Sequence, residues 1–226
     1  IEDRDFEAEL SEMKDLSAAA NYSIDKAAMQ LFNGSFATTV SVNGYNMTWY
    51  GDAKPLASTI HPTVVVGGST QSNASSTGIK LSHDNLETAR LALELQQTDN
   101  GLAITMAGKT ALVLPLTLEK TGMEVINSEL TPENSNNAIN VFRGSMDVIT
   151  SKFLDTTNGG LNTRWFLLNQ GTHKLFYESR QEKRLETGVN TLNKVMTFTV
   201  DARWANYVKD WRGVWASKGD LSSYSS

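Results

Sequence analysis

The segment AITMAGKT, residues 103–110, comes nearest of any in the chain to an enzyme motif, the phosphate-binding loop GxxxxGK[ST]. That loop needs glycine at both ends, because its backbone amides close around phosphate oxygens. Ala103 stands at the first glycine position, and the β-prone run ALVLP follows Thr110 where a helix N-terminus should face the anion. We therefore interpret Gly108-Lys109-Thr110 as a β-turn and not as a nucleotide site.

Histidine and cysteine offer no metal centre in the sequence. His61, His83 and His173 are far apart, and no two of them share the spacing of metal ligands. We interpret them as a turn histidine, a capping-region histidine and a loop-tip histidine. The chain has no cysteine, which excludes disulfides, thiolate metal sites and a cysteine nucleophile. We predict no metal site and no cofactor.

Carboxylates and serines likewise lack a catalytic frame. Two pairs are near enough in sequence to act as acid–base partners, Glu129 with Glu133 and Glu178 with Glu182. Charged residues in such polar segments are usually just solvated. Gly144-Ser145 lacks the GxSxG frame of a serine nucleophile. The sequence therefore predicts that the protein is not an enzyme.

The composition sets limits on partners and location. The 226 residues include 25 acidic and 20 basic side chains, and the net charge of −5 gives no basic surface for tight nucleic-acid binding. No apolar run approaches the roughly 18 residues of a membrane span, so we expect no membrane contact. The absence of cysteine fits assembly inside a cell. Because the chain starts at Ile1 and not at Met, we expect the natural product to be longer.

Residues 2–32 predict one amphipathic helix. Apolar residues recur every three or four positions, at Phe6, Leu10, Met13, Leu16 or Ala20, Ile24, Ala27 or Ala28, and Leu31. A helix of about 31 residues spans about 46 Å, whereas a compact globule of this chain length has a diameter of about 45 Å. The helix therefore either kinks near residues 21–23 or belongs to an elongated, flat subunit, and we favour the second.

The rest of the chain mixes strands with further helices. Short β-prone runs and turns fill residues 37–80, a helix begins at Ser82 and ends near residues 99–101, and another begins at Pro115. We predict strands at residues 102–106, 110–114, 139–142, 146–149, 164–168 and 175–179. A last strand alternates apolar and polar residues over 196–204, which is typical of a half-buried antiparallel strand. The predicted fold class is α+β, with helices covering a mixed or antiparallel sheet.

The segment RWANYVKDWRGVW, residues 203–215, concentrates aromatic side chains near the end of the chain. If residues 209–215 are extended, Trp211, Gly213 and Trp215 project from one face, and the glycine lets a neighbouring backbone approach. Core packing would explain these indoles, and so would an interface between subunits, where Trp, Tyr and Arg concentrate. We predict five interface or structural anchors: Trp204, Tyr207, Trp211, Arg212 and Trp215.

Several segments resemble the major capsid proteins of tailed phages, particularly the Mu-type major head subunits. In the C-terminal half the matching motifs are Trp165-Phe166-Leu167, Phe176-Tyr177-Glu178-Ser179-Arg180 and Asp210-Trp211-Arg212-Gly213. Upstream, the similar segments are AAMQLFNGSF, the His61-Pro62 loop, Gln71-Ser72-Asn73 and LVLPLTLEKTGMEVINSE. The resemblance extends from about Ala27 to Gly219.

The resemblance implies the Hong-Kong-ninety-seven-type capsid fold, with a long spine helix, a peripheral domain and an axial domain with a mixed sheet. Residues 1–80 would form the peripheral domain with its spine helix and loop region, and residues 81–185 the axial domain. Residues 186–226 would return long strands to the peripheral domain. The family's N-terminal arm and extended loop have no match here, so no cross-linking residue is carried over.

The resemblance also implies a function. It is that of a major capsid protein, which self-assembles into the icosahedral shell that encloses phage double-stranded DNA without sequence-specific binding. The implied partners are identical subunits in hexamers and pentamers, together with scaffolding, portal and decoration proteins. The implied location is the virion capsid, assembled in the host cytoplasm. An encapsulin-like cargo nanocompartment is the alternative, and a nucleotide-binding enzyme using Gly108-Lys109-Thr110 ranks third.

Overall fold

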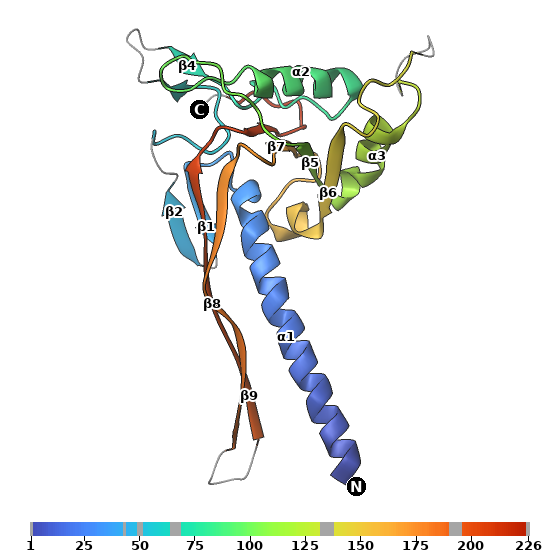
Figure 1. Cartoon of the computed structure of the whole chain (residues 1–226), viewed down its shortest axis with the longest axis vertical. Helices are drawn as coiled ribbons and strands as arrows, with labels where there is room; N and C mark the ends of the chain where they lie inside the picture. The colour runs from blue at the N-terminus through green and yellow to red at the C-terminus, as the bar shows by residue number, and fades with distance from the viewer. Residues whose placement is uncertain are drawn as a thin grey trace. The chain divides into compact units, whose positions relative to one another are not determined.

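The computed structural model describes residues 2–42, 44–48, 52–63, 69–131, 138–189 and 196–224. Its α-helices, shown in Figure 1, are α1 (Glu2–Asn33), α2 (His83–Glu94) and α3 (Glu119–Asn127). Short 3-10 turns occur at Leu116–Leu118, Lys152–Leu154 and Thr156–Asn158. The strands are β1 (Thr39–Val42), β2 (Tyr45–Thr48), β3 (His61–Pro62), β4 (Thr70–Gln71), β5 (Thr110–Pro115), β6 (Met146–Ser151), β7 (Trp165–Asn169), β8 (Lys174–Val189), β9 (Met196–Asp210) and β10 (Val214–Ser217).

The contacts of the chain divide it into two compact units. The first, which we call the helix–hairpin unit, comprises Ile1–Ala28 and Phe176–Tyr207. The second, which we call the sheet unit, comprises Met29–Leu175 and Val208–Ser226. The boundaries expected at residues 80 and 185 refer to roles within a shell, and they stay predictions.

Helix α1 confirms the long helix predicted from the apolar spacing. It runs without interruption through residues 21–23 and ends at Asn33. The side chains of Phe6 and Leu10 lie outside the described part of the structure. Among the described side chains, the less exposed positions include those of the predicted stripe, Met13, Leu16, Ala20, Ile24, Ala27 and Leu31.

Strands β8 and β9 pair as a long two-stranded hairpin. Both extend further than predicted, because β8 continues to Val189 and β9 to Asp210. From residue 197 to residue 207 of β9, even-numbered side chains are half-buried or buried and odd-numbered ones are exposed, which confirms the predicted alternation. Within the helix–hairpin unit, Nζ of Lys183 donates hydrogen bonds to Oγ of Ser17 (2.7 Å) and Oδ1 of Asn21 (3.1 Å).

The sheet unit is built on a four-stranded mixed sheet with the strand order β10-β7-β5-β6. β5 and β6 are parallel, with Thr110 opposite Met146, whereas β7 is antiparallel to both β5 and β10. A parallel pair cannot be joined by a tight turn, and α3 lies in the crossover between β5 and β6. The α+β class and the mixed sheet are therefore confirmed.

Alternation along the strands divides the core of the sheet unit into two layers. Side chains on one face pack with residues of α2 and α3, and they include Leu112, Leu114, Trp165, Leu167 and Trp215. The other face is covered in part by Phe32 at the end of α1, and it includes Val113, Phe166 and Ala216. β5 is buried on both faces, which explains its nearly continuous apolar sequence, TALVLP.

Two predicted strands are wrong. In the segment 102–106 the only described pairing is a single bridge between Ala103 and Gln97, because the chain folds back in a tight loop after α2. In the segment 139–142 Ile139 forms a single bridge to Leu130, and residues 141–145 then form a turn. α2 also ends earlier than expected, at Glu94.

Candidate functional site

The tryptophan-rich terminus is not one extended strand. β9 ends at Asp210, residues 211–213 form a turn, and β10 begins at Val214. The Asp210 carboxylate accepts the backbone N–H of Arg212 at 3.1 Å, and Gly213 has a φ of +78°. The condition under which Trp211, Gly213 and Trp215 would share one strand face, an extended segment 209–215, is therefore not met. The close approach predicted at Gly213 is confirmed, because its Cα faces the backbone of residues 172–173.

The two tryptophans of this terminus enter different hydrophobic clusters of the sheet unit. Trp215 is buried beside Trp165, with ring centroids 5.0 Å apart. Trp211 packs instead with a cluster that includes Leu31, Val40 and Leu56. Their positions make both indoles internal anchors of the sheet unit. A further role of Trp211 or Trp215 at a subunit interface stays a prediction.

The other predicted aromatic anchors belong to the helix–hairpin unit and are less buried. Tyr207 is 40% exposed and stacks on Phe176 with centroids 5.3 Å apart. Trp204 is half-buried on the alternating face of β9. Neither side chain is as deeply buried as that of Trp215. Their role as interface anchors stays a prediction.

The turn after β9 is held by a cluster of side chains that we call the Trp211 clasp. Its members are His61, Asn73, Trp211 and Arg212. The imidazole of His61 stacks on the indole of Trp211, with centroids 4.1 Å apart and planes 4° from parallel. Nδ1 of His61 lies 2.6 Å from Oδ2 of Asp52, and Nε2 lies 3.0 Å from Oδ1 of Asn73. His61 is 1% exposed, so its interpretation as a turn histidine is wrong. It is a buried part of the clasp, with a polar side chain against each ring nitrogen.

Asn73 links three segments of the sheet unit through its buried amide. Nδ2 donates to the carbonyl oxygens of Leu56 (2.8 Å) and Trp211 (3.4 Å), and Oδ1 accepts the backbone N–H of Ser58 (2.9 Å). The backbone oxygen of Asn73 also accepts the N–H of Ala216 at 2.9 Å. These partners fix the orientation of the amide, because each amide atom already faces a group of the opposite hydrogen-bonding type.

Arg212 closes the clasp with charge-assisted hydrogen bonds. Its Nε donates to the carbonyl of Gln97 (2.7 Å), and its terminal nitrogens donate to the carboxylates of Asp99 (2.6 Å) and Asp210 (3.1 Å). The guanidinium carbon lies 4.6 Å from the ring centroid of Trp211. With its donors engaged and its side chain 11% exposed, Arg212 is fixed in place. The clasp therefore holds four segments together: residues 52–61, Asn73, residues 97–99 and residues 210–212.

The stability of the clasp should depend on pH through His61. Burial lowers the pKa of His61 below its ordinary value of 6.5, although hydrogen bonds to Asp52 and Asn73 oppose this effect. The unfolded chain therefore binds a proton at a higher pH than the folded chain. We expect the free energy of unfolding to decrease as the pH falls from about 6.5 towards the lowered pKa, with a slope of at most about 1.4 kcal/mol per pH unit from this residue.

Denaturant titrations between pH 7.5 and 5 test this expectation. His173 has a pKa lowered by burial as well, so it contributes with the same sign. His61→Gln should therefore reduce the slope of the free energy of unfolding against pH. His173→Gln should remove only the contribution of His173, so the contribution of His61 should remain. An unchanged slope in His61→Gln would show that this imidazole does not carry the pH dependence.

Sequence reasoning missed the contribution of His61 and Asn73 to the Trp211 clasp, although the resemblance to the capsid family gave a signal of it. Both residues lie in segments that resemble the capsid family, the His61-Pro62 loop and Gln71-Ser72-Asn73. Some of their partners lie more than a hundred residues away, such as the backbone oxygen of Trp211 and the backbone N–H of Ala216. A resemblance in a short loop can therefore mark a buried junction before the fold is known.

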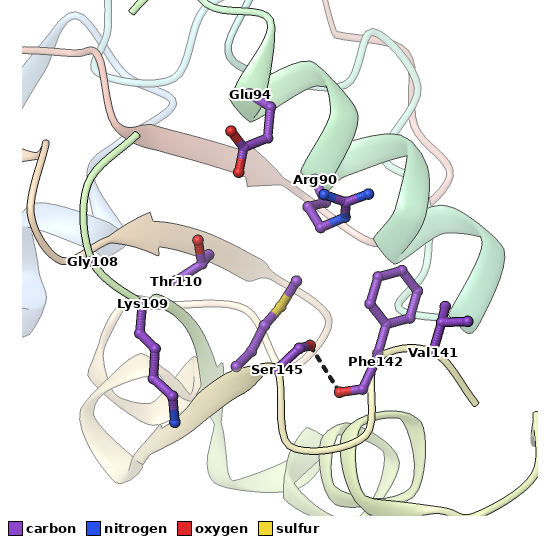
Figure 2. A pocket seen from close by; sticks show the side chains of 9 residues that line it. Arg90, Glu94, Gly108, Lys109, Thr110, Val141, Phe142 and Ser145 are labelled. Atoms are coloured by element: carbon purple, nitrogen blue, oxygen red, sulfur yellow. Dashed lines mark hydrogen bonds between the residues drawn. The ribbon is translucent and has the colours of Figure 1, made fainter. Parts of the chain in front are cut away.

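A pocket of about 380 Å³ lies between α2, the start of β5 and the turn at residues 141–145 (Figure 2). Gly108-Lys109-Thr110 forms one side of it. Gly108 has a φ of +75°, and Thr110 begins strand β5, which confirms the predicted strand at this position. Nζ of Lys109 is 2.9 Å from Oδ1 of Asp147, and this hydrogen bond lowers the pKa of Asp147.

Among the described residues, no group of three or more acidic or histidine side chains could hold a metal ion. His83 is buried beside Phe142, with centroids 4.9 Å apart, and Nδ1 of His173 accepts the backbone N–H of Leu175. In the same described ranges no helix is both long and apolar enough to cross a membrane.

Comparisons with known proteins agree with the resemblance to phage capsid proteins. Residues 1–217 match the family model described as phage capsid protein. A structure from Mycobacterium phage Patience is similar with a TM-score of 0.50 at 12% identity, covering 95% of this chain and 65% of that chain. The chain thus spans slightly less than two thirds of that relative, and at this identity the likeness shows the fold alone.

Two further structures are similar to a lesser degree. The capsid of an empty GTA particle gives a TM-score of 0.46 at 13% identity, covering 93% of this chain and 66% of that chain. A virus-like particle from Pyrococcus furiosus gives 0.35 at 16% identity, covering 62% and 56%. No curated protein sequence matches the chain.

Proposed function

The chain belongs to the phage capsid protein family, and from this premise we propose that it is a major capsid subunit that self-assembles into an icosahedral shell around packaged double-stranded DNA. In that shell identical copies would form hexamers and pentamers. Closure makes many modest interfaces act together, because each subunit is held by several neighbours at once. The shell would be part of the virion and would assemble in the host cytoplasm with scaffolding, portal and decoration proteins.

The observation that carries this proposal is the absence of a hydrophobic core in the described part of the helix–hairpin unit. None of the three buried clusters in the described residues draws on this unit. Of its described side chains only Ala27 and Asn206 are buried. Its exposed apolar residues include Phe176, Tyr177, Leu185, Val189 and Tyr207.

Such a unit needs partners to cover it. A domain of about 60 residues is marginal even with a core, and an isolated two-stranded hairpin is marginally stable at best in water. Apolar side chains displayed along a long hairpin are typical of a surface that other molecules cover. In a shell built from one subunit, those molecules are further copies of the same chain.

The net charge of the chain is compatible with a shell that encloses DNA without binding it tightly. The net charge of −5 provides no general attraction for phosphates. Salt-dependent binding of many phosphates would hold the packaged DNA to the wall. A lining of this charge would leave the DNA free to enter and leave.

The predicted domain roles belong to the same proposal. Residues 1–80 would supply the peripheral domain with α1 as the spine helix, and residues 81–185 the axial domain around the symmetry axes. Residues 186–226 would return to the peripheral domain. The Hong-Kong-ninety-seven type of fold and the likeness to Mu-type head subunits are proposed on the same motifs.

Electron microscopy of the purified chain, with scaffolding protein supplied, tests the proposed function. We expect closed shells of uniform diameter, and nucleic-acid analysis of particles from infected cells should find double-stranded DNA. Uniform monomers at high concentration would contradict the shell. Shells that hold a protein cargo and no DNA would instead identify a nanocompartment.

A matched pair of variants tests the role of the helix–hairpin unit. Leu185→Asp places a charge on an apolar residue that is 39% exposed, and we expect it to reduce shell formation at least tenfold. Leu221→Asp is the control, because Leu221 is 61% exposed outside this unit and has a φ of +62°, which aspartate tolerates. Equal assembly of the two variants would contradict a role for the hairpin surface.

A further inference from the structure

The long strand β8 is paired along one edge only. In the described residues β8 and β9 form a sheet of two strands, and no isolated bridge of this part of the chain involves β8. The other edge of this 16-residue strand, which we call the β8 edge (residues 177–185), therefore presents a row of unpaired backbone N–H and C=O groups. Such a row is a template for the addition of another strand.

One face of β8 carries charges of alternating sign. Every second side chain of a strand points to the same face, and successive side chains on that face are about 7 Å apart. The charged set on this face is Glu178, Arg180, Glu182, Arg184 and Glu186. Its first four members are exposed. Within the described residues, the ion pair formed by this set joins Arg184 to Glu186, and the other three members are in none.

These alternating charges make the β8 edge complementary to itself when two copies lie antiparallel. In the register that places Gln181 opposite Gln181 of a second copy, Glu178 lies opposite Arg184 of that copy. Arg180 then lies opposite Glu182. Each pair occurs twice, because the contact is two-fold symmetric. Opposite charges that face each other across neighbouring strands stabilise a sheet, so this register has a favourable pair at each of these positions.

The other face of β8 fits the same register. Tyr177 lies opposite Leu185 of the second copy, and these two side chains are 50% and 39% exposed in the single chain. Ser179 lies opposite Lys183, whose Nζ already donates hydrogen bonds to α1. The two Gln181 amides meet at the axis, where each can donate to the other and accept from it. Pairing therefore brings together the apolar side chains that one chain leaves exposed.

Neighbouring registers fit less well. With the axis at Glu182, this residue faces its own copy and Arg180 faces Arg184, so like charges meet. With the axis at Lys183, opposite charges match again, but Lys183 faces Lys183. The register about Gln181 is therefore specified by the charges, as one face of a strand specifies its pairing when the two faces differ.

We propose that the β8 edge pairs antiparallel with the β8 edge of a second copy, about a two-fold axis at Gln181. The pairing joins two hairpins into one sheet in the order β9-β8-β8-β9. It gives backbone partners to the free edges and converts two marginal two-stranded hairpins into a four-stranded sheet. The inference deepens the proposed function and rests on it, because it names the surfaces of one contact between copies in the shell.

Single cysteines test the register, because the chain has no cysteine of its own. Directly opposite Cβ atoms of an antiparallel pair are about 4.5–5.5 Å apart, close to the spacing that a disulfide needs. Mild oxidation of assembled Gln181→Cys particles should therefore give disulfide-linked dimers. Ser179→Cys and Lys183→Cys should each give at least tenfold less, whereas an equimolar mixture of these two should give dimers. Equal yields at the three positions, or a disulfide to another protein, would overturn the pairing.

Charge reversal tests the ion pairs between copies. Arg180→Glu and Glu182→Arg each place like charges opposite each other twice, so each alone should raise the concentration needed for assembly at least tenfold. An equimolar mixture of the two variants should return that concentration to within about threefold of the unsubstituted chain. Mixing cannot relieve repulsion within one chain, so the rescue reports a contact between copies. Arg203→Glu, at an exposed position of β9, is the control and should change the concentration less than threefold.

The outcomes separate this pairing from the proposed function. Shells that form while oxidised Gln181→Cys stays monomeric on a denaturing gel would overturn the pairing and leave the shell intact. A mixture of the charge-reversed variants that assembles no better than either one alone would also overturn it. Disulfide-linked Gln181→Cys dimers in a chain that forms no shells would support the pairing and contradict the proposed function instead.

Discussion

Replacing Trp165 by alanine is expected to lower the free energy of unfolding by about 3–5 kcal/mol. Trp165 is fully buried at the start of β7, an inner strand of the mixed sheet, and its ring packs against that of Trp215. Removal of the indole leaves a cavity that the rigid strands β7 and β10 cannot close, and it exposes Trp215 to that cavity. Of the tryptophans in the described residues, Trp165 has the most complete burial.

The loss should come from packing more than from hydrogen bonding. Nε1 of Trp165 donates to the carbonyl of Ile79 at 2.8 Å, but the hydroxyl of Ser217 donates to the same oxygen at 2.8 Å. The oxygen therefore keeps a donor after the substitution, which avoids the cost of an unsatisfied buried acceptor. Urea unfolding followed by far-ultraviolet circular dichroism measures the effect.

Trp204→Ala is the matched control for this substitution. Trp204 is half-buried on the hairpin of the helix–hairpin unit, so its removal should cost less than about 2 kcal/mol in the unassembled chain. If the two variants lost equal stability, the two-layered core around Trp165 could not be the main source of the stability of the sheet unit.

Periodic patterns in the sequence predicted the elements that bury one or two continuous faces. α1 follows from apolar residues three and four apart, and β9 from the alternation of apolar and polar residues over 196–204. β5 is predicted because its apolar run is short and bounded by turn residues. In each case local side-chain spacing and tertiary burial require the same structure, so the pattern is a reliable guide.

The turn at residues 211–213 shows where periodicity fails. Trp211, Gly213 and Trp215 have the spacing of one strand face, which they would share if residues 209–215 were extended. The carboxylate of Asp210 instead binds the N–H of Arg212, and Gly213 adopts a positive φ. A side chain that competes for the backbone hydrogen bond overrides a pattern of apolar residues, and the Asp-x-x-Gly sequence was the signal of it.

The Trp211 clasp could not be predicted in its geometry, because its members are joined only by the tertiary fold. Asn73 meets the carbonyl of Trp211, and Arg212 reaches Asp99, across long separations in sequence. Exposed polar and buried polar residues look alike in a sequence. The burial of His61 between Asp52 and Asn73 becomes visible only when the strands and loops are placed.

Replacing Gly213 by alanine is expected to lower the free energy of unfolding by about 3 kcal/mol or more, for two separable reasons. A φ of +78° costs a residue with a Cβ about 1–2 kcal/mol. The added Cβ would also lie 2.6 Å from the backbone nitrogen of His173, and a backbone atom cannot move aside as a flexible side chain can. The turn is further fixed by the Gly213 N–H, which donates to Oε1 of Gln96 at 2.8 Å.

Gly144→Ala separates these two costs. Gly144 also has a positive φ, +67°, but an added Cβ there would meet nothing within 4 Å. Its substitution should therefore cost only the conformational part, about 1–2 kcal/mol. Chemical denaturation of the two variants should differ by at least about 1.5 kcal/mol, the contribution of the close approach. If Gly213→Ala cost no more than Gly144→Ala, the backbone of residues 172–173 would have room to move. The turn would then be held by the Trp211 clasp alone, not by close packing against this segment.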